Sequence, residues 1–203
     1  MRRAKAIVLA SASPRRKEIL AKTGLSFRVD ASDDHEKAEH GLSPRALARR
    51  LSYRKAVSVA SRHKNAVIIA ADTFIVFGGR IFGKPRTAAE ARRILKTLQG
   101  KKHSVITGFT IMDTATKKKL SRSVETKVYF RKMSPGEING YVRSREPLDK
   151  AGAYAIQGSG AAFIRKIEGD YHNVVGFPLS ALMDGLKKFG IRVVRPVRRT
   201  GER

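Results

Sequence analysis

The chain has 203 residues, of which 41% are hydrophobic and 30% charged, which suits a globular protein with a real core and excludes a disordered chain. It contains no cysteine, so disulfides, thiolate metal sites and cysteine nucleophiles are excluded. The 43 Lys and Arg residues against 17 Asp and Glu give a formal net charge of +26. Such a surface attracts polyanions, so nucleic acid and a phosphorylated substrate are both candidate partners, although dispersed charge is more often a solvated surface.

The first apolar run is a short strand. It covers residues 6–10, which is less than the roughly 7–15 residues of a signal-peptide core. No apolar run approaches the ~20 residues of a membrane span. We therefore expect a cytoplasmic protein that is not bound to a membrane.

Two helices with the same start signal precede the next strand. Ser13 and Ser43 are candidate N-caps, and each is followed by a proline at the first helical position. The first helix should end before Gly24, and the second should run to about residue 62. The apolar run 66–72 is predicted to be a strand that ends in an aspartate, followed by a hairpin around residues 78–79.

The second half continues the alternation of helix and strand. Capping boxes at Thr87/Glu90 and Ser134/Glu137 predict two more helices, with strands at 104–112 and 124–130 between them. A glycine-rich stretch, 146–160, precedes a last helix with apolar residues at helical spacing from Leu179 to Phe189. The pattern indicates an α/β layered fold in one domain, residues 1–203, with a basic strand and tail from about 191 to 203.

The stretch "SPRR" places Arg15 and Arg16 in the first turn of a helix. That position is electrostatically unfavourable for cations, at a cost of a few tenths to about 1 kcal/mol each, because helix N-termini carry a partial positive charge. A bound anion would remove the conflict, since the free N–H groups of a helix start also bind anions. The alternative is two solvated arginines.

Asp72 is the leading candidate carboxylate. A strand end is where α/β sheets place ligands, and an aspartate there can hold a cation or act as a general base. It could instead only cap the following turn. Thr73 and nearby glycines leave room for a ligand.

The remaining candidates are lysines and one acidic loop. Lys55 projects from the apolar face of its helix, Lys84 lies on a loop before a proline, and Lys150 is a further candidate cation. Glu36 belongs to an acidic patch that could also be a loop balancing nearby basic residues. The five histidines lack metal-ligand spacing. Several cations with two carboxylates are what a metal-dependent phosphoanhydride hydrolase needs.

Six motifs in order, "LASASPRRKEIL", "ADT", "GKP", "ITGF", "VETKVYF" and "EPLDKAGAYAIQG", resemble the Maf family of nucleoside triphosphate pyrophosphatases. The resemblance spans residues 7 to 190. It implies an ITPase-like fold, in which two α/β lobes and a mixed twisted sheet surround a deep cleft, and often a homodimer. It also implies hydrolysis between the α and β phosphates with Mg²⁺, Mn²⁺ or Co²⁺. Ala153, Tyr154 and Gln157 are similar to the branch that prefers dTTP and UTP.

The resemblance also implies roles for single residues. Asp72 would be the proton acceptor and, with Glu36, a metal ligand. The substrate would be bound by the remaining candidates, which are Ser13, Arg15, Arg16, Lys55, Thr73, Lys84 and Gln157. Among these, Arg15 and Thr73 would set specificity, and Gln157 would contact the base or hold the site closed. The alternative is a basic nucleic-acid-binding or regulatory Maf-like protein with little or no hydrolysis.

Overall fold

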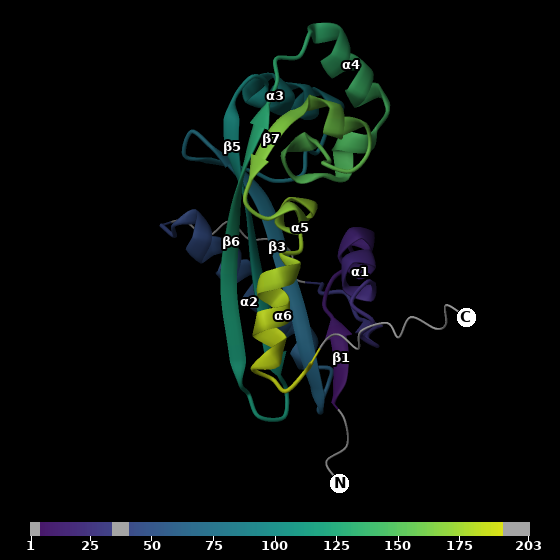
Figure 1. Cartoon of the computed structure of the whole chain (residues 1–203), viewed down its shortest axis with the longest axis vertical. Helices are drawn as coiled ribbons and strands as arrows, with labels where there is room; N and C mark the ends of the chain where they lie inside the picture. Colours follow the sequence, from purple (N-terminus) through teal and green to yellow (C-terminus); the bar gives the residue numbers. More distant parts are fainter. Residues whose placement is uncertain (1–4, 34–40, 193–203) are drawn as a thin grey trace, which may run out of the picture.

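The computed structural model describes residues 5–33 and 41–192. These residues form a seven-stranded mixed sheet flanked by helices, in the order β2-β1-β3-β5-β6-β7, with β4 paired to β3 (Figure 1). The strands are β1 (Ala6–Leu9), β2 (Arg28–Val29), β3 (Ala66–Phe77), β4 (Arg80–Phe82), β5 (Lys102–Asp113), β6 (Lys119–Phe130) and β7 (Ile164–Glu168). The helices are α1 (Pro14–Ala21), α2 (Pro44–Ala60), α3 (Ala88–Leu98), α4 (Pro135–Arg143), α5 (Tyr171–Val175) and α6 (Leu179–Lys187). The predicted α/β fold with a mixed sheet is confirmed. Of the predicted basic segment 191–203, residues 193–203 lie outside the described part.

The helix starts follow the predicted capping residues. Each cap side chain accepts a hydrogen bond from the backbone N–H three residues later; the caps are Ser13 for α1, Ser43 for α2, Thr87 for α3 and Ser134 for α4. The box at Ser134 and Glu137 is reciprocal. The box at Thr87 is not, because Glu90 accepts a hydrogen bond from the N–H of Arg86 instead, at 2.8 Å.

Strand β3 is longer than the sequence suggests, and this corrects the position of Asp72. The strand does not end at Asp72 but continues to Phe77, because β5 pairs with it as far as Val76. Its other neighbour, β1, is parallel and pairs only with Ala66–Ile69. One edge of β3 therefore has no strand partner between Ile69, where β1 stops, and Ile75, where β4 begins to pair, and the connection from β1 to α1 lies on that side. Asp72 lies in this part of the strand.

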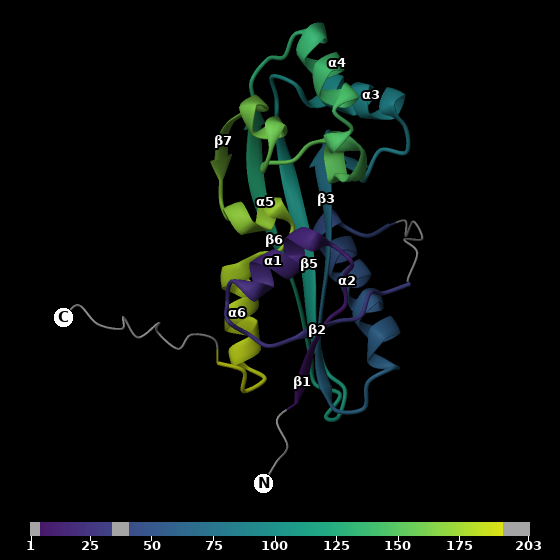
Figure 2. The same ribbon diagram turned by 90° about the vertical axis from the view of Figure 1, so that its right-hand side faces the viewer.

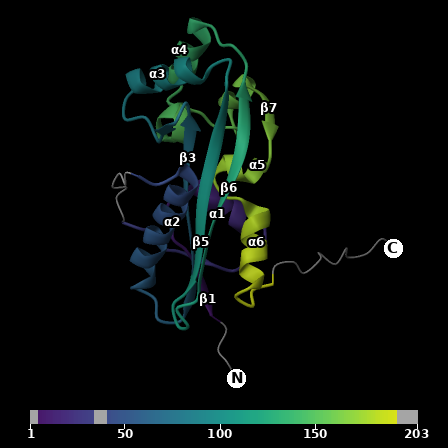
Figure 3. The ribbon, with the colours of Figure 1, turned by 90° about the vertical axis from the view of Figure 1, so that its left-hand side faces the viewer.

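Helices cover both faces of the lower half of the sheet. On one face α2 packs against side chains that alternate along β3, among them Ile68, Ala70 and Phe74. The opposite face carries Val67, Ile69 and Ala71 and packs against α1 and α6. Figure 3 shows α2 and α6 on opposite sides of the strands. Asp72 shares the α2 face and Thr73 the other, because successive side chains of a strand alternate.

A second lobe lies at the other end of the sheet. Helices α3 and α4 and the turns of residues 146–163 pack there around a separate apolar core that includes Leu95, Phe130 and Tyr154. Strands β3, β5 and β6 run through both lobes, as Figure 1 shows. The lobes are therefore joined by continuous strands. No helix in residues 5–33 and 41–192 is long and apolar enough to cross a membrane.

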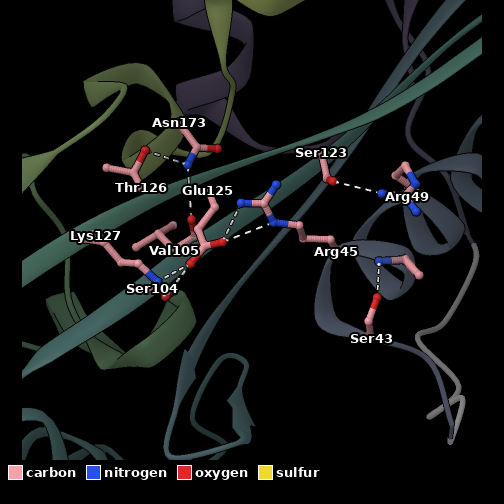
Figure 4. Close-up of polar contacts among 11 residues, drawn as sticks. Ser43, Arg45, Arg49, Ser104, Val105, Ser123, Glu125, Thr126, Lys127 and Asn173 are labelled. Atoms are coloured by element: carbon pink, nitrogen blue, oxygen red, sulfur yellow. Dashed lines mark hydrogen bonds and ion pairs between the residues drawn. The ribbon is translucent and has the colours of Figure 1, made fainter.

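A partly buried carboxylate ties α2 to the sheet (Figure 4). Glu125 on β6 accepts hydrogen bonds from Arg45 of α2, at 2.8 and 3.1 Å, from Ser104 at 2.8 Å, and from Lys127. Lys127 is the main cause that lowers the pKa of Glu125 to about 2, and Ser104 and Arg45 add to it against the opposing effect of burial. Folding therefore favours the ionised form of Glu125.

The depressed pKa of Glu125 predicts a loss of stability in acid. Its contribution to the free energy of unfolding is complete above the ordinary pKa of 4.5 and disappears as the pH falls towards about 2. We expect Glu125→Gln to lower the melting temperature at pH 7 and to weaken its dependence on pH between 4.5 and 2. Thermal melts at several pH values would measure this. The control is Glu18→Gln, on the exposed side of α1; equal pH slopes for Glu125→Gln and wild type would contradict the assignment.

Candidate active site

Two adjoining cavities lie where β1 ends and α1 begins. The first, the catalytic cavity, has a volume of about 120 Å³, and the second, the basic cavity, about 450 Å³. Their shared lining residues are Ser13, Arg15, Arg16, Lys55 and Lys84. Asp72 and Thr73 line only the catalytic cavity, and Lys150 lines only the basic cavity.

Seven of the nine predicted site residues therefore come together. Gln157 does not join them: its side chain is exposed, and it lines neither cavity. Glu36 lies outside the described residues. The contacts to the base predicted for Gln157, and the metal contact predicted for Glu36, stay predictions.

Asp72 and Lys55 form an ion pair inside the catalytic cavity. The side chain of Asp72 is only 5% exposed, and that of Lys55 is 17% exposed. Lys55 reaches the sheet because it occupies the same face of α2 as Leu51 and Val59, one turn to either side, which pack on the strands. The ion pair thus places a lysine cation directly beside the buried carboxylate.

Arg16 is held by the protein itself. Its guanidinium donates to the carbonyl of Ala71 at 2.8 Å, the carbonyl of Gly176 at 2.9 Å, Thr73 Oγ1 at 3.0 Å and Ser11 Oγ at 3.2 Å. These bonds join the start of α1 to β3 and to the end of α5, which lie next to each other in Figure 2. Arg16 thus links α1, β3 and the end of α5, and its predicted contact with phosphates stays a prediction.

Arg15 and Lys84 are different, because their side chains form no hydrogen bond or salt bridge with any residue of 5–33 or 41–192. Burial lowers the pKa of Arg15, and the charge of Asp149 opposes that shift most among its neighbours. Lys84 lies on a loop that is fixed by a hydrogen bond from the N–H of Gly152 to the carbonyl of Gly83, at 2.9 Å. Two cations without a salt-bridge partner and the start of α1 make the cleft attractive to an anion.

One wall of the catalytic cavity is apolar. It is formed by Ile75, Val105, Tyr154, Val174 and Val175. Two of these come from α5, a five-residue helix that sequence analysis did not predict because it is too short for a periodic pattern. A cap at Asp170, whose carboxylate accepts from the N–H of His172 at 2.7 Å, was the available signal.

Buried polar residues hold this wall in place. Asn173 Nδ2 donates to the carbonyl of Val105 at 3.1 Å and to Thr126 Oγ1 at 2.9 Å, which fixes α5 to the sheet (Figure 4). The hydroxyl of Tyr154 bonds His103 Nε2 at 2.8 Å. Burial lowers the pKa of His103 to about 4, so this imidazole is neutral at pH 7 and serves packing rather than acid–base chemistry.

The cavity has a donor for a divalent cation but not a complete protein site. Within the described ranges no group of three or more His, Asp and Glu side chains gathers. Mg²⁺ in phosphoryl chemistry is commonly held by one or two carboxylates together with substrate phosphate oxygens. Asp72 fits that donor set.

Comparison with known proteins agrees with this geometry. The family described as Maf-like protein matches residues 6–189. A dTTP/UTP pyrophosphatase of Pelotomaculum thermopropionicum is 47% identical over 190 residues, covering 94% of this chain and 100% of that protein. A dTTP/UTP pyrophosphatase of Methanosarcina barkeri is 46% identical over 188 residues, covering 92% and 95%.

The fold also resembles a structure of low sequence identity. The Ham1 protein of Staphylococcus aureus superimposes with a TM-score of 0.52 at 13% identity, covering 91% of this chain and 100% of that one. This likeness supports the two-lobed α/β fold, while the sequence comparison establishes the family. With the cavity, its cations and its carboxylate in place, the chain belongs to the Maf family.

Proposed function

We propose that this protein hydrolyses dTTP or UTP to the nucleoside monophosphate and diphosphate. One observation carries the proposal: the buried carboxylate of Asp72 faces a cavity that also exposes Arg15 and Lys84, two cations without a salt-bridge partner in the described residues. A polyphosphate supplies the missing negative charge, and the carboxylate supplies a proton acceptor. The names of the relatives, dTTP/UTP pyrophosphatase, support the nucleotide and the bond that is cleaved.

In this mechanism Asp72 accepts a proton from a water molecule, whose oxygen attacks the α-phosphorus. The bond from the α-phosphorus to the oxygen that bridges to the β-phosphorus breaks, and diphosphate leaves with that oxygen. Lys55 holds the carboxylate in position. Arg15 and Lys84 stabilise the charge that develops on the phosphate oxygens, which is commonly the largest catalytic contribution. A divalent cation such as Mg²⁺, Mn²⁺ or Co²⁺, held by Asp72 and the phosphates, would add to this neutralisation.

The proposal is tested by a nucleotide panel. Purified protein would be incubated with Mg²⁺ and each of dTTP, UTP, CTP, GTP, ATP and 7-methyl-GTP, and monophosphate and diphosphate would be quantified. We expect equal amounts of both products, with dTTP and UTP cleaved fastest. Release of inorganic phosphate in place of diphosphate, or turnover of none of the six, would refute it.

Lys84→Ala is expected to lower kcat/KM for dTTP by about 10²–10³-fold, because it removes one fixed donor to the phosphates. The side chain is exposed, so the melting temperature should not change. The matched control is Lys17→Ala, which removes an exposed lysine of α1 that lines neither cavity. If both variants retained wild-type turnover, Lys84 would have no part in catalysis.

The cellular location, the oligomeric state and any binding of nucleic acid are further points of the proposal. A cytoplasmic location and a homodimer stay predictions, and size-exclusion chromatography with light scattering would measure the second. The family relation does not favour the alternative of a basic binding protein without hydrolysis. Nucleic acid would be bound only non-specifically by the basic surface, with an affinity that falls steeply with salt.

A further inference from the structure

Lys150 is a cavity lysine that the mechanism above does not use. Its side chain is 15% exposed and lines the basic cavity together with Arg15 and Lys84. It forms an ion pair with its neighbour Asp149, whose side chain is 70% exposed. The lysine is thus largely enclosed, while Asp149 lines the same cavity at its solvent-exposed side.

The loop that carries Lys150 is fixed beside the loop that carries Lys84. The hydrogen bond from the N–H of Gly152 to the carbonyl of Gly83 joins the two loops. Gly152 has a φ of +70°, and a Cβ there would lie 2.0 Å from Cδ1 of Ile75, so only glycine allows this approach. The two lysines are therefore placed at one cavity by backbone geometry.

Asp149 interacts with two of the cavity's cations. Burial raises the pKa of its carboxyl, but the hydrogen bond from Lys150 and the charges of Lys150 and Arg15 outweigh burial and lower it. The same carboxylate opposes the loss of charge at Arg15. The carboxylate of Asp149 therefore offsets part of the positive charge of Lys150 and Arg15, which would otherwise attract an anionic ligand.

The two cavities differ in what they can hold. The catalytic cavity contains Asp72 and the apolar wall, so the α-phosphorus would lie there, beside the carboxylate. The basic cavity lacks both and adds Lys150, while Arg15 and Lys84 extend through the two. The β and γ phosphates of a substrate whose α-phosphorus lies at Asp72 would therefore extend towards Lys150.

We propose that Lys150 binds the diphosphate end of the substrate, and that Asp149 occupies this lysine until the phosphates displace it. This inference rests on the proposed function, because the orientation depends on attack at the α-phosphorus. The exchange is favourable because phosphate oxygens carry more charge than one carboxylate, and the exposed Asp149 can turn to solvent. Lys150 would then be a substrate-binding residue, and Asp149 a competitor for it.

The test compares Lys150→Met and Asp149→Asn with wild type in the full-length protein. Calorimetry would measure the Kd of inorganic diphosphate with Mg²⁺, and separately that of thymidine monophosphate. We expect Lys150→Met to weaken diphosphate binding about 10- to 100-fold. We expect Asp149→Asn to strengthen it by about two- to fivefold, as for loss of an exposed ion pair. Neither variant should change the Kd of the monophosphate.

The matched control is Lys166→Met, which removes a lysine that is ion-paired with Glu168 in the same lobe but lines neither cavity. Its diphosphate Kd should equal that of wild type. If the Lys150–Asp149 ion pair only stabilised the fold, Lys150→Met and Asp149→Asn would change the Kd of diphosphate in the same direction. Opposite changes in this Kd would therefore indicate that Lys150 binds diphosphate and that Asp149 competes with it. Melting curves would check folding, and Lys150→Arg should keep most of the affinity.

The outcomes distinguish this inference from the proposed function. If wild type cleaves dTTP but Lys150→Met binds diphosphate as wild type does, Lys150 has no role and the function stands. If wild type neither cleaves dTTP nor binds diphosphate, both proposals are wrong. If Asp149→Asn weakens diphosphate binding, the competition is refuted even where Lys150 contributes.

Discussion

Asp72→Asn is expected to reduce the turnover of dTTP by about 10²–10⁴-fold, the usual contribution of a positioned general base. The amide keeps the shape of the side chain but cannot accept a proton from water, and it leaves Lys55 without its carboxylate. Steady-state kinetics with saturating Mg²⁺ would measure kcat and KM. The decrease should appear mainly in kcat, because the lost interaction belongs to the transition state.

Asp113→Asn provides the control for a buried, lysine-paired aspartate with no catalytic position. Asp113 is paired with Lys5 and has a side chain 7% exposed, close to the 5% of Asp72. It lies at the far end of β5, where its carboxylate also accepts the N–H of Ala115 at 3.0 Å. We expect this variant to lose stability and to keep its kcat. An equal fall in kcat for both variants would show that Asp72 acts through folding alone.

Gly108→Ala should destabilise the protein strongly, because the added methyl group would clash with the backbone of α2. Gly108 lies opposite Asp72 in the β3–β5 register, and its Cβ would stand 2.0 Å from the carbonyl oxygen of Ala48. That oxygen is backbone, so α2 must move as a unit. Overpacking of this kind commonly costs about 1–3 kcal/mol, which corresponds to a melting temperature lower by about 2–12 °C.

The movement should also reach the active site, since α2 carries Lys55. Calorimetric melting and dTTP turnover would be measured on the same samples. Gly140→Ala is the matched control, because this glycine is inside α4 and a Cβ there meets nothing within 4 Å. It should raise the free energy of unfolding by about 0.5–1 kcal/mol. A stability unchanged in Gly108→Ala would mean that α2 can shift at no cost.

Short-range signals in the sequence were sufficient to predict where most helices and one hairpin of this protein lie. Cap residues at Ser13 and Ser43, the reciprocal box at Ser134, and the glycines after helices predicted where helices begin and end, because those signals act within one turn. The hairpin around residues 78–79 was predicted for the same reason. The order of the motifs indicated the family, and with it most of the residues that line the two cavities.

Only the tertiary structure decided where those residues lie and what they contact. Asp72 is inside a strand rather than at its end, because β5 extends the pairing past the point where β1 stops. Arg16, alike in sequence to Arg15, is held by carbonyls of Ala71 and Gly176, which lie 55 and 160 residues away along the chain. The adjacency of Lys84 and Lys150 likewise depends on one backbone bond between distant loops. Such contacts depend on where the whole sheet places its neighbours, and no local pattern of residues encodes that.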